Sequence, residues 1–232
     1  MRYDGWRRKS LVDHFWDVDV SAQAVAEGTA LERGDFAAGE YLADVHRSPE
    51  RIVVALARTG NAWGIPFTLT KSITVAAGSP VLEIAYALTD LPSDFRQHLA
   101  VEFNFAGLPA RAEGRFFADE AGRALGELGT ALDLPTARSL ALVDGWLDIE
   151  ARLTFAAATN GAEAGVWTFP IQSVSQSEGG FELVHQSVVV MPHWIVTPDA
   201  AGRWGVTLRL ALGRASARIT AGTPASPSRS PA

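Results

Sequence analysis

Residues 167–182 read WTFPIQSVSQSEGGFE, the most informative stretch of the chain. Its first residues are apolar and favour β structure, because aromatic and branched side chains suit a pleated, half-buried surface. The stretch becomes polar at residues 172–177 and reaches Gly179-Gly180, a turn signal, before a second apolar run at residues 181–191. The pattern predicts two buried strands joined by a polar turn. That turn either satisfies its own backbone groups or forms the edge of a ligand-binding site.

Strand patterns continue on both sides of this stretch. Residues 51–58 (RIVVALAR) are apolar on both faces, as expected for a strand covered by a second sheet. In residues 67–75 and 204–212, apolar and polar side chains alternate, which is typical of a strand with one buried face. Residues 21–28 predict a short helix with Ser21 as its N-cap. Further strands are predicted at residues 81–88, 98–107, 115–117, 139–143 and 146–155. The sequence thus predicts an all-β fold, a large antiparallel β-sandwich.

The strand pattern defines one domain over residues 1–213. The chain has 232 residues, of which 47% are hydrophobic, so it can bury a real core. From residue 214 the composition changes to Ala, Ser, Thr, Pro and Arg, ending TPASPSRSPA. Such a segment cannot bury enough apolar surface to order itself, and residues 214–232 are therefore predicted to be a disordered tail.

Composition excludes several classes of function. The net charge of −6 and a pI near 5.4, with scattered basic residues, argue against a nucleic-acid partner or an anionic membrane surface. The absence of cysteine excludes disulfides and thiolate zinc sites, and it fits a reducing compartment. No apolar run approaches the roughly 20 residues of a membrane span. Charged residues follow Met1 at once, so no signal peptide is predicted and we expect a soluble, cytoplasmic protein.

Lys71 interrupts the alternation of residues 67–75, because it falls on the face that carries the apolar side chains. An unpaired buried ammonium is costly, so Lys71 predicts a nearby carboxylate or a stem that reaches water. Glu102 is the first candidate for that carboxylate. It shares the polar face of residues 98–107 with Asn104. This face is interpreted either as a sugar- or cation-binding patch or as a solvated outer surface.

Two groupings of polar residues suit particular chemistries. The oxygen atoms of Asp13, Glu102 and Asn104 suit a hard cation such as Ca²⁺. Glu102 and Glu178 suit the acid and base of a glycosidase if their separation is right. His14, in an apolar segment, is interpreted as a hydrogen-bonded structural histidine. Standard nucleophile, zinc and nucleotide motifs do not occur, so no catalytic residue, metal site or cofactor is assigned.

Seven tryptophans are many for this length, and exposed aromatic rings serve sugar-binding proteins as platforms. Trp63 lies in the loop TGNAWGIP, and Trp6 and Trp194 lie beside breakers or charges, so these three are candidate platforms. His185 and His193 flank a buried-looking run and are predicted to be structural. The tryptophans predicted to pack in the core or at its rim are Trp146, Trp167 and Trp204.

Several segments together resemble a known family. They are YDGWRRKSLVDHFW at residues 3–16, VEFNFAG at 101–107, and WTFPIQSVSQSEGGFELVHQ at 167–186, followed by PHW at 192–194. The chain resembles the C-terminal β-sandwich domain of prokaryotic α-amylases and 4-α-glucanotransferases of glycoside hydrolase family 57. The resemblance covers the chain from residue 3 to about residue 212, in the expected order.

The resemblance implies a galactose-mutarotase-like supersandwich, packed beside a larger catalytic barrel in the full enzyme. In that family the two catalytic carboxylates belong to the barrel, so no catalytic residue is carried over. The motif positions are carried over with fold maintenance and glucan contact as competing roles. The resulting carbohydrate-binding candidates are Asp13, His14, Trp63, Glu102, Asn104, Gln176, Glu178 and Trp194.

The leading hypothesis is a non-catalytic sandwich domain of an α-amylase- or 4-α-glucanotransferase-like enzyme. Its expected partners are a catalytic barrel, in cis or in trans, and an α-glucan or oligosaccharide. The alternative is a stand-alone mutarotase-like epimerase or glycosidase that acts through a histidine–glutamate acid–base pair. A third hypothesis is a purely structural module without a ligand.

Overall fold

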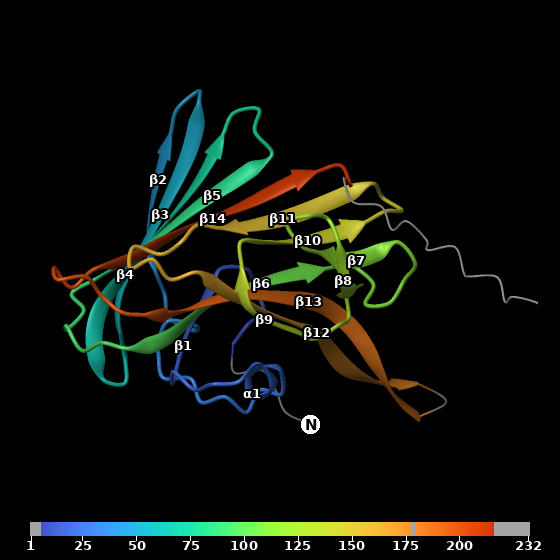
Figure 1. The fold of residues 1–232 in the computed structure, drawn as a ribbon, viewed down its shortest axis with the longest axis horizontal. Coiled ribbons are helices and arrows are strands. Elements are labelled where there is room, and N and C mark those ends of the chain that lie inside the picture. Colours follow the sequence, from blue (N-terminus) through green and yellow to red (C-terminus); the bar gives the residue numbers. More distant parts are fainter. Residues whose placement is uncertain (1–5, 178–179, 216–232) are drawn as a thin grey trace, which may run out of the picture.

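Two antiparallel sheets pack face to face in the computed structural model, which describes residues 6–177 and 180–215 (Figure 1). The prediction of an all-β antiparallel sandwich is confirmed. One helix is described, α1 (Ala22–Ala26), and the side chain of its N-cap Ser21 accepts a hydrogen bond from the Ala24 amide, as predicted. Within the described ranges, no helix is long and apolar enough to cross a membrane.

The chain order of the strands differs from their order in the sheets. The five-stranded sheet has, in spatial order, β1 (Val12–Trp16), β6 (Gln97–Ala106), β13 (Gly180–Val196), β12 (Ala164–Ser177) and β9 (Leu132–Ala137). The nine-stranded sheet has, in spatial order, β2 (Leu42–Arg47), β3 (Arg51–Ala62), β4 (Ile65–Ala76), β5 (Val81–Thr89), β14 (Trp204–Gly213), β11 (Ile149–Phe155), β10 (Ser139–Asp144), β7 (Arg115–Ala118) and β8 (Ala124–Glu127).

The main core lies between the two sheets. Leu99, Val101 and Phe103 of β6 alternate with polar neighbours and join a buried cluster that includes Phe67 and Leu69 of β4. Each side chain of this size, fully buried, contributes about 1.5–3 kcal/mol of transfer free energy. The alternation predicted for β4 and β6 therefore places the apolar faces of both strands in the core.

The opposite face of the five-stranded sheet is also covered. A second buried cluster joins Trp16 of β1, Ala100 of β6 and Met191 of β13 to Val25 of α1. The polar residues of β6 alternate with its core residues, so they lie on this second face. Polar side chains predicted for an open sheet surface are consequently placed beneath the N-terminal part of the chain.

Strands β12 and β13 continue beyond the sandwich as a two-stranded ribbon, which we call the arm (residues 172–177 and 180–186; Figure 1). β12 pairs with β9 only up to Thr168, and β13 pairs with β6 only from Ser187. The prediction that residues 172–177 form a turn is wrong, because they extend β12 as a strand. Polar side chains suit this ribbon because solvent reaches it.

One strand boundary and several strands differ from the prediction. The strand predicted at residues 146–155 begins only at Ile149, because Asp148 immediately before it has a φ of 55°, which is not an extended conformation. Strands β2, β8 and β9 were not predicted. Residues 214 and 215 follow β14 without forming a strand, and the rest of the predicted tail, residues 216–232, lies outside the described residues.

Candidate functional site

Asp13 of β1 lies at the centre of a buried polar cluster between the sheets. The Tyr41 hydroxyl and the Lys71 ammonium donate to its Oδ2 atom at 2.5 and 2.6 Å, and the Tyr86 hydroxyl donates to Oδ1 at 2.8 Å. Asp13 is 1% and Lys71 is 4% exposed. The predicted carboxylate partner of Lys71 exists, but the prediction that it is Glu102 is wrong, because Glu102 lies on the other face of the five-stranded sheet.

The Asp13 cluster borders a pocket that Trp6 and Phe36 also line, but its hydrogen bonds are satisfied among its own residues. Lys71 also donates to the Leu11 carbonyl at 2.6 Å, and Leu11 adopts a φ of 63°, an uncommon conformation for a branched residue. Burial and the Asp13 carboxylate raise the pKa of Tyr41 and Tyr86 well above the usual value, so both hydroxyls remain protonated donors. The cluster ties β1 to β4 and β5 and leaves no carboxylate oxygen without a donor.

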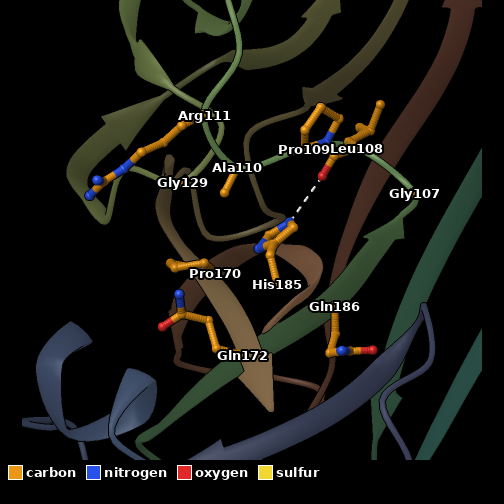
Figure 2. Close-up of a pocket in the computed structure, with 10 residues that line it drawn as sticks. All are labelled: Gly107, Leu108, Pro109, Ala110, Arg111, Gly129, Pro170, Gln172, His185 and Gln186. Atoms are coloured by element: carbon orange, nitrogen blue, oxygen red, sulfur yellow. Dashed lines mark hydrogen bonds between the residues drawn. The ribbon is translucent and has the colours of Figure 1, made fainter. Parts of the chain in front are cut away.

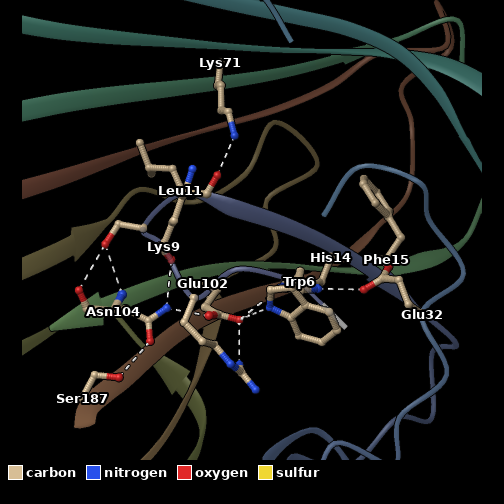
Figure 3. A network of polar contacts seen from close by, with 12 residues as sticks. Trp6, Lys9, Leu11, His14, Phe15, Glu32, Lys71, Glu102, Asn104 and Ser187 are labelled. Atoms are coloured by element: carbon tan, nitrogen blue, oxygen red, sulfur yellow. Dashed lines mark hydrogen bonds and ion pairs between the residues drawn. The ribbon is translucent and has the colours of Figure 1, made fainter. Parts of the chain in front are cut away.

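Glu102 of β6 organises a second buried cluster on the opposite face (Figure 3). Its Oε2 atom accepts from Trp6 at 3.2 Å and Arg8 at 3.1 Å, and lies 3.2 Å from His14 Nε2. Its Oε1 atom accepts from the Asn104 amide at 2.5 Å. The N-terminal segment therefore lies across the polar face of β6, where Trp6 and Arg8 of this segment, His14 of β1 and Asn104 of β6 surround the carboxylate.

His14 connects two carboxylates. Its Nδ1 atom lies 2.7 Å from Glu32 Oε2, and its Nε2 atom faces Glu102. Burial alone would lower the pKa of His14, but hydrogen bonds and charges from Glu102 and Glu32 raise it to about 9. Burial alone would raise the pKa of Glu102, but His14 and Arg8 hold it below the usual value. At neutral pH the cluster thus contains an imidazolium between carboxylates.

The interpretation of Glu102 and Asn104 as an accessible patch or a solvated face is wrong. Glu102 is fully buried, and the Asn104 amide donates to the Lys9 carbonyl at 2.9 Å and to Glu102. Asp13 lies on one face of the five-stranded sheet, and Glu102 and Asn104 lie on the other. The oxygen atoms of these three residues therefore cannot bind one cation together. Among residues 6–177 and 180–215, no group of three or more carboxylates and histidines is placed to hold a metal ion.

The buried residues His98 and Trp167 form a third group with His193, which is partly buried. His98 Nε2 and His193 Nδ1 are 2.9 Å apart, and the His193 ring stacks on Trp167 with ring centroids 4.0 Å apart. Burial lowers the pKa of His98 to about 4 and that of His193 to about 3, so both rings are neutral. A Cβ atom on Gly165 would lie 2.3 Å from the His193 ring, which explains the glycine there. The structural role predicted for His193 is confirmed.

The division of the tryptophans into exposed and buried residues differs in part from the prediction. Trp63 is 53% exposed at a φ of 55°, as its loop position indicates. Its indole N–H donates to Asp17 at 2.6 Å, and the Arg33 guanidinium lies 4.1 Å above its ring. Trp194 is 2% exposed in the core, so its role as a platform is wrong. Trp146 is 79% exposed and not in the core, whereas Trp167 and Trp204 are buried as predicted.

The arm and its base hold the remaining polar candidates. Gln176 is an exposed residue of the arm, and Glu178 lies outside the described residues. Sequence reasoning missed a pocket at the base of the arm, where Gln172 and His185 lie opposite each other (Figure 2). The polar run at residues 172–177 could have indicated this pocket. Because the run was interpreted as a turn, the pairing of Gln172 with His185 was not predicted.

These geometries limit the chemistry of the site. Within the described residues, the structure brings His14 into contact with two glutamates, Glu32, whose side chain is 21% exposed, and Glu102. The side chains of His14 and Glu102 are 0% exposed. A sugar cannot reach them without displacement of the N-terminal segment. The arrangement therefore fixes the N-terminal segment to the sandwich and does not offer an acid–base pair to a substrate.

Comparisons with known proteins agree with this description. The sequence profile of the family described as "Alpha-amylase/4-alpha-glucanotransferase, C-terminal" matches residues 1–208. A 4-alpha-glucanotransferase from Thermococcus kodakarensis is 23% identical over 193 residues, which cover 81% of this chain and 24% of that protein. The chain thus spans about a quarter of the length of this relative.

Solved structures show the same fold. The crystal structure of 4-alpha-glucanotransferase from Thermococcus litoralis superposes with a TM-score of 0.66 at 21% identity, over 90% of this chain and 28% of that one. A putative aldose 1-epimerase from Escherichia coli K12 superposes with a TM-score of 0.53 at 10% identity, over 90% of this chain and 81% of that one. The profile match over nearly the whole chain shows that this protein belongs to the α-amylase/4-α-glucanotransferase C-terminal domain family.

Proposed function

We propose that this chain is a non-catalytic sandwich domain that supports the catalytic barrel of an α-glucan-processing enzyme, within the same polypeptide or as a separate chain. The relatives are about four times longer than the segment that matches, which supports a partner domain beside this one. The buried state of His14 and Glu102 argues against the alternative of a stand-alone epimerase or glycosidase. A cytoplasmic location is part of the proposal and fits the absence of cysteine.

The observation that carries this proposal is the apolar face of the arm. Phe181 is 79% and Leu183 is 65% exposed, and they share a face because they are two residues apart on one strand. Val174, 41% exposed, lies directly opposite Leu183 on the same face. Single apolar residues on a surface are ordinary, but a contiguous strip on a projecting ribbon is typical of an interaction site. We assign the catalytic barrel as its occupant.

Phe181→Ser combined with Leu183→Ser is expected to weaken binding to the catalytic barrel encoded with this chain by roughly 100-fold, since losing two central apolar anchors costs about 3 kcal/mol. Calorimetry with the two separately produced domains measures the affinity. Leu42→Ser is the matched control, because Leu42 is 83% exposed on β2, outside the arm. Equal affinities for all three proteins, or dimerisation of the chain through its arm, would contradict the assignment.

A second proposed role is contact with an α-1,4-glucan at Trp63. The indole is held by the bond to Asp17 and by Arg33 over its ring, yet half of the side chain faces solvent. A ring held in place loses little conformational entropy when a pyranose stacks on it. Asp17, whose pKa is held below the usual value mainly by the Arg33 hydrogen bond, supplies an ionised acceptor beside the ring.

Trp63→Ala is expected to weaken maltoheptaose binding by roughly 30-fold, the loss typical of a central tryptophan anchor. Affinity electrophoresis through gels containing the glucan, supported by calorimetry, measures the change. Trp146→Ala serves as the control because Trp146 is more exposed, at 79%, and its ring is less firmly held, with the Arg115 guanidinium 5.5 Å from the ring centroid against 4.1 Å for Arg33 and Trp63. If both variants bind like the parent chain, Trp63 is not the platform.

A further inference from the structure

The pocket at the base of the arm has no part in the functions proposed above. Its volume is about 750 Å³, within the range of about 300–1,000 Å³ usual for ligand sites. The loop at residues 107–111 and Gly129 form one side, and strand residues of β12 and β13 form the other. Figure 2 shows His185 bonded to Leu108, with Pro170 and Gln172 on the other side of its ring.

A β-bulge places the polar residues of this pocket. Ile171 pairs with Ser187, whereas Gln172 pairs with His185, so Gln186 has no counterpart on β12. Bulges of this kind redirect side chains and are common beside functional sites. Here the bulge lets His185 and Gln186, which are consecutive in sequence, both line the pocket together with Gln172.

The hydrogen bond of His185 determines what its ring can bind. His185 Nε2 lies 2.9 Å from the Leu108 carbonyl oxygen, which only accepts, so Nε2 carries the hydrogen and donates it. In the neutral ring Nδ1 is then an acceptor. Nδ1 is buried and has no hydrogen-bond partner in the described part of the chain. An unpaired buried acceptor is uncommon in folded proteins, and it marks a place for a ligand or water donor.

Gln172 supplies the complementary groups. Its side chain is exposed, lies opposite His185 and makes no hydrogen bond to another described residue, so its amide offers two donors and one acceptor. Leu108, Pro109 and Pro170 form apolar walls beside these polar groups. The pocket thus combines a buried acceptor, an adaptable amide and apolar surface.

We propose that this pocket binds a neutral oligosaccharide. When a sugar displaces the part of the pocket wall that covers His185 Nδ1, one of its hydroxyls donates its hydrogen to this atom, and a neighbouring hydroxyl bonds with the Gln172 amide. The C–H faces of pyranose rings suit the proline and leucine walls. A fully ionised anion has no hydrogen to donate to Nδ1, so the fixed tautomer favours hydroxyl groups over sulfate or carboxylate. The choice of an α-glucan as first ligand rests on the proposed function.

Titration of the intact chain with maltotriose, followed by NMR, tests this proposal. We expect saturable shifts of the Gln172 side-chain amide and the His185 imidazole nitrogens, and no such shifts with sulfate. Gln172→Ala is expected to weaken maltotriose binding about threefold to tenfold, the effect of one neutral hydrogen bond. His185→Gln retains a donor for Leu108 but lacks the Nδ1 acceptor, and an effect of similar size is expected. Trp63→Ala is expected to leave these shifts unchanged.

The control is Gln176→Ala, because Gln176 is an exposed glutamine of the same strand outside the pocket. Thermal unfolding of each variant shows that its fold is intact. Binding of cellotriose in place of maltotriose would support the pocket and reject only the α-glucan assignment. The proposal is overturned if neither trisaccharide shifts Gln172 and His185, if sulfate competes, or if Gln176→Ala weakens binding as much as Gln172→Ala.

Discussion

Asp13→Ala is expected to lower the free energy of unfolding by about 3–5 kcal/mol, because it leaves the Lys71 ammonium buried without its carboxylate. The hydroxyls of Tyr41 and Tyr86 lose their common acceptor in the same variant. Urea denaturation at pH 7, followed by tryptophan fluorescence, measures the change. This is the largest effect that we expect from a single substitution outside the apolar core.

Two further variants identify the cause. Glu83→Gln removes the exposed ion pair between Glu83 and Arg209 and is expected to change stability by less than about 1 kcal/mol. Asp13→Leu combined with Lys71→Met removes both buried charges, and it is expected to recover much of the stability lost in Asp13→Ala. If Asp13→Ala is no more harmful than Glu83→Gln, the buried pair does not hold β1 in place.

The second large effect concerns His14 and alkaline pH. The pKa of His14 is about 9 in the folded chain and about 6.5 in an unfolded one. The imidazolium therefore contributes stability that is fully present below pH 6.5 and is lost as the pH rises through 9. The total is about 3 kcal/mol, since each pKa unit corresponds to about 1.4 kcal/mol. Urea unfolding at intervals between pH 6 and pH 10 follows this loss.

His14→Gln is the control, because it fills a similar volume without a titratable group. Its stability is expected to be lower at neutral pH and to change little between pH 6.5 and 9. Titration of lysines and tyrosines contributes to both proteins and cancels in their difference. Parallel curves for His14→Gln and the parent chain would show that His14 is not charged between Glu32 and Glu102.

The alternation of single strands could be predicted from the sequence, whereas the contacts between sheets could not. Phe67 and Leu69 are buried as the period of two indicates, and Lys71 is buried with a carboxylate as its desolvation cost requires. The identity of that carboxylate depends on which face of the five-stranded sheet meets β4. Asp13 lies on the face that meets β4, whereas Glu102 lies on the opposite face, and no local sequence pattern distinguishes the two.

The candidate site was harder to predict, because exposure depends on parts of the chain that are distant in sequence. Trp194 follows Pro192 and looks like a surface residue, but it packs against Trp204, 6.0 Å away between ring centroids. Gln172 and His185 meet because a bulge shifts their register by one residue, and such a shift leaves no clear mark in the sequence.

Strand β14 has a consequence for the order in which this chain folds during synthesis. In the nine-stranded sheet it lies between β5 and β11. It therefore connects the strands β2 to β5 on one side to β11, β10, β7 and β8 on the other. Ile84 of β5 pairs with Leu208 of β14, and Leu153 of β11 pairs with Leu210 of β14. Until β14 has been synthesised, neither β5 nor β11 has a partner on the side where β14 lies. A nascent chain thus carries two open hydrophobic edges until β14 leaves the ribosome. Such late, non-local pairing predicts slow folding and a need for chaperones in the interval.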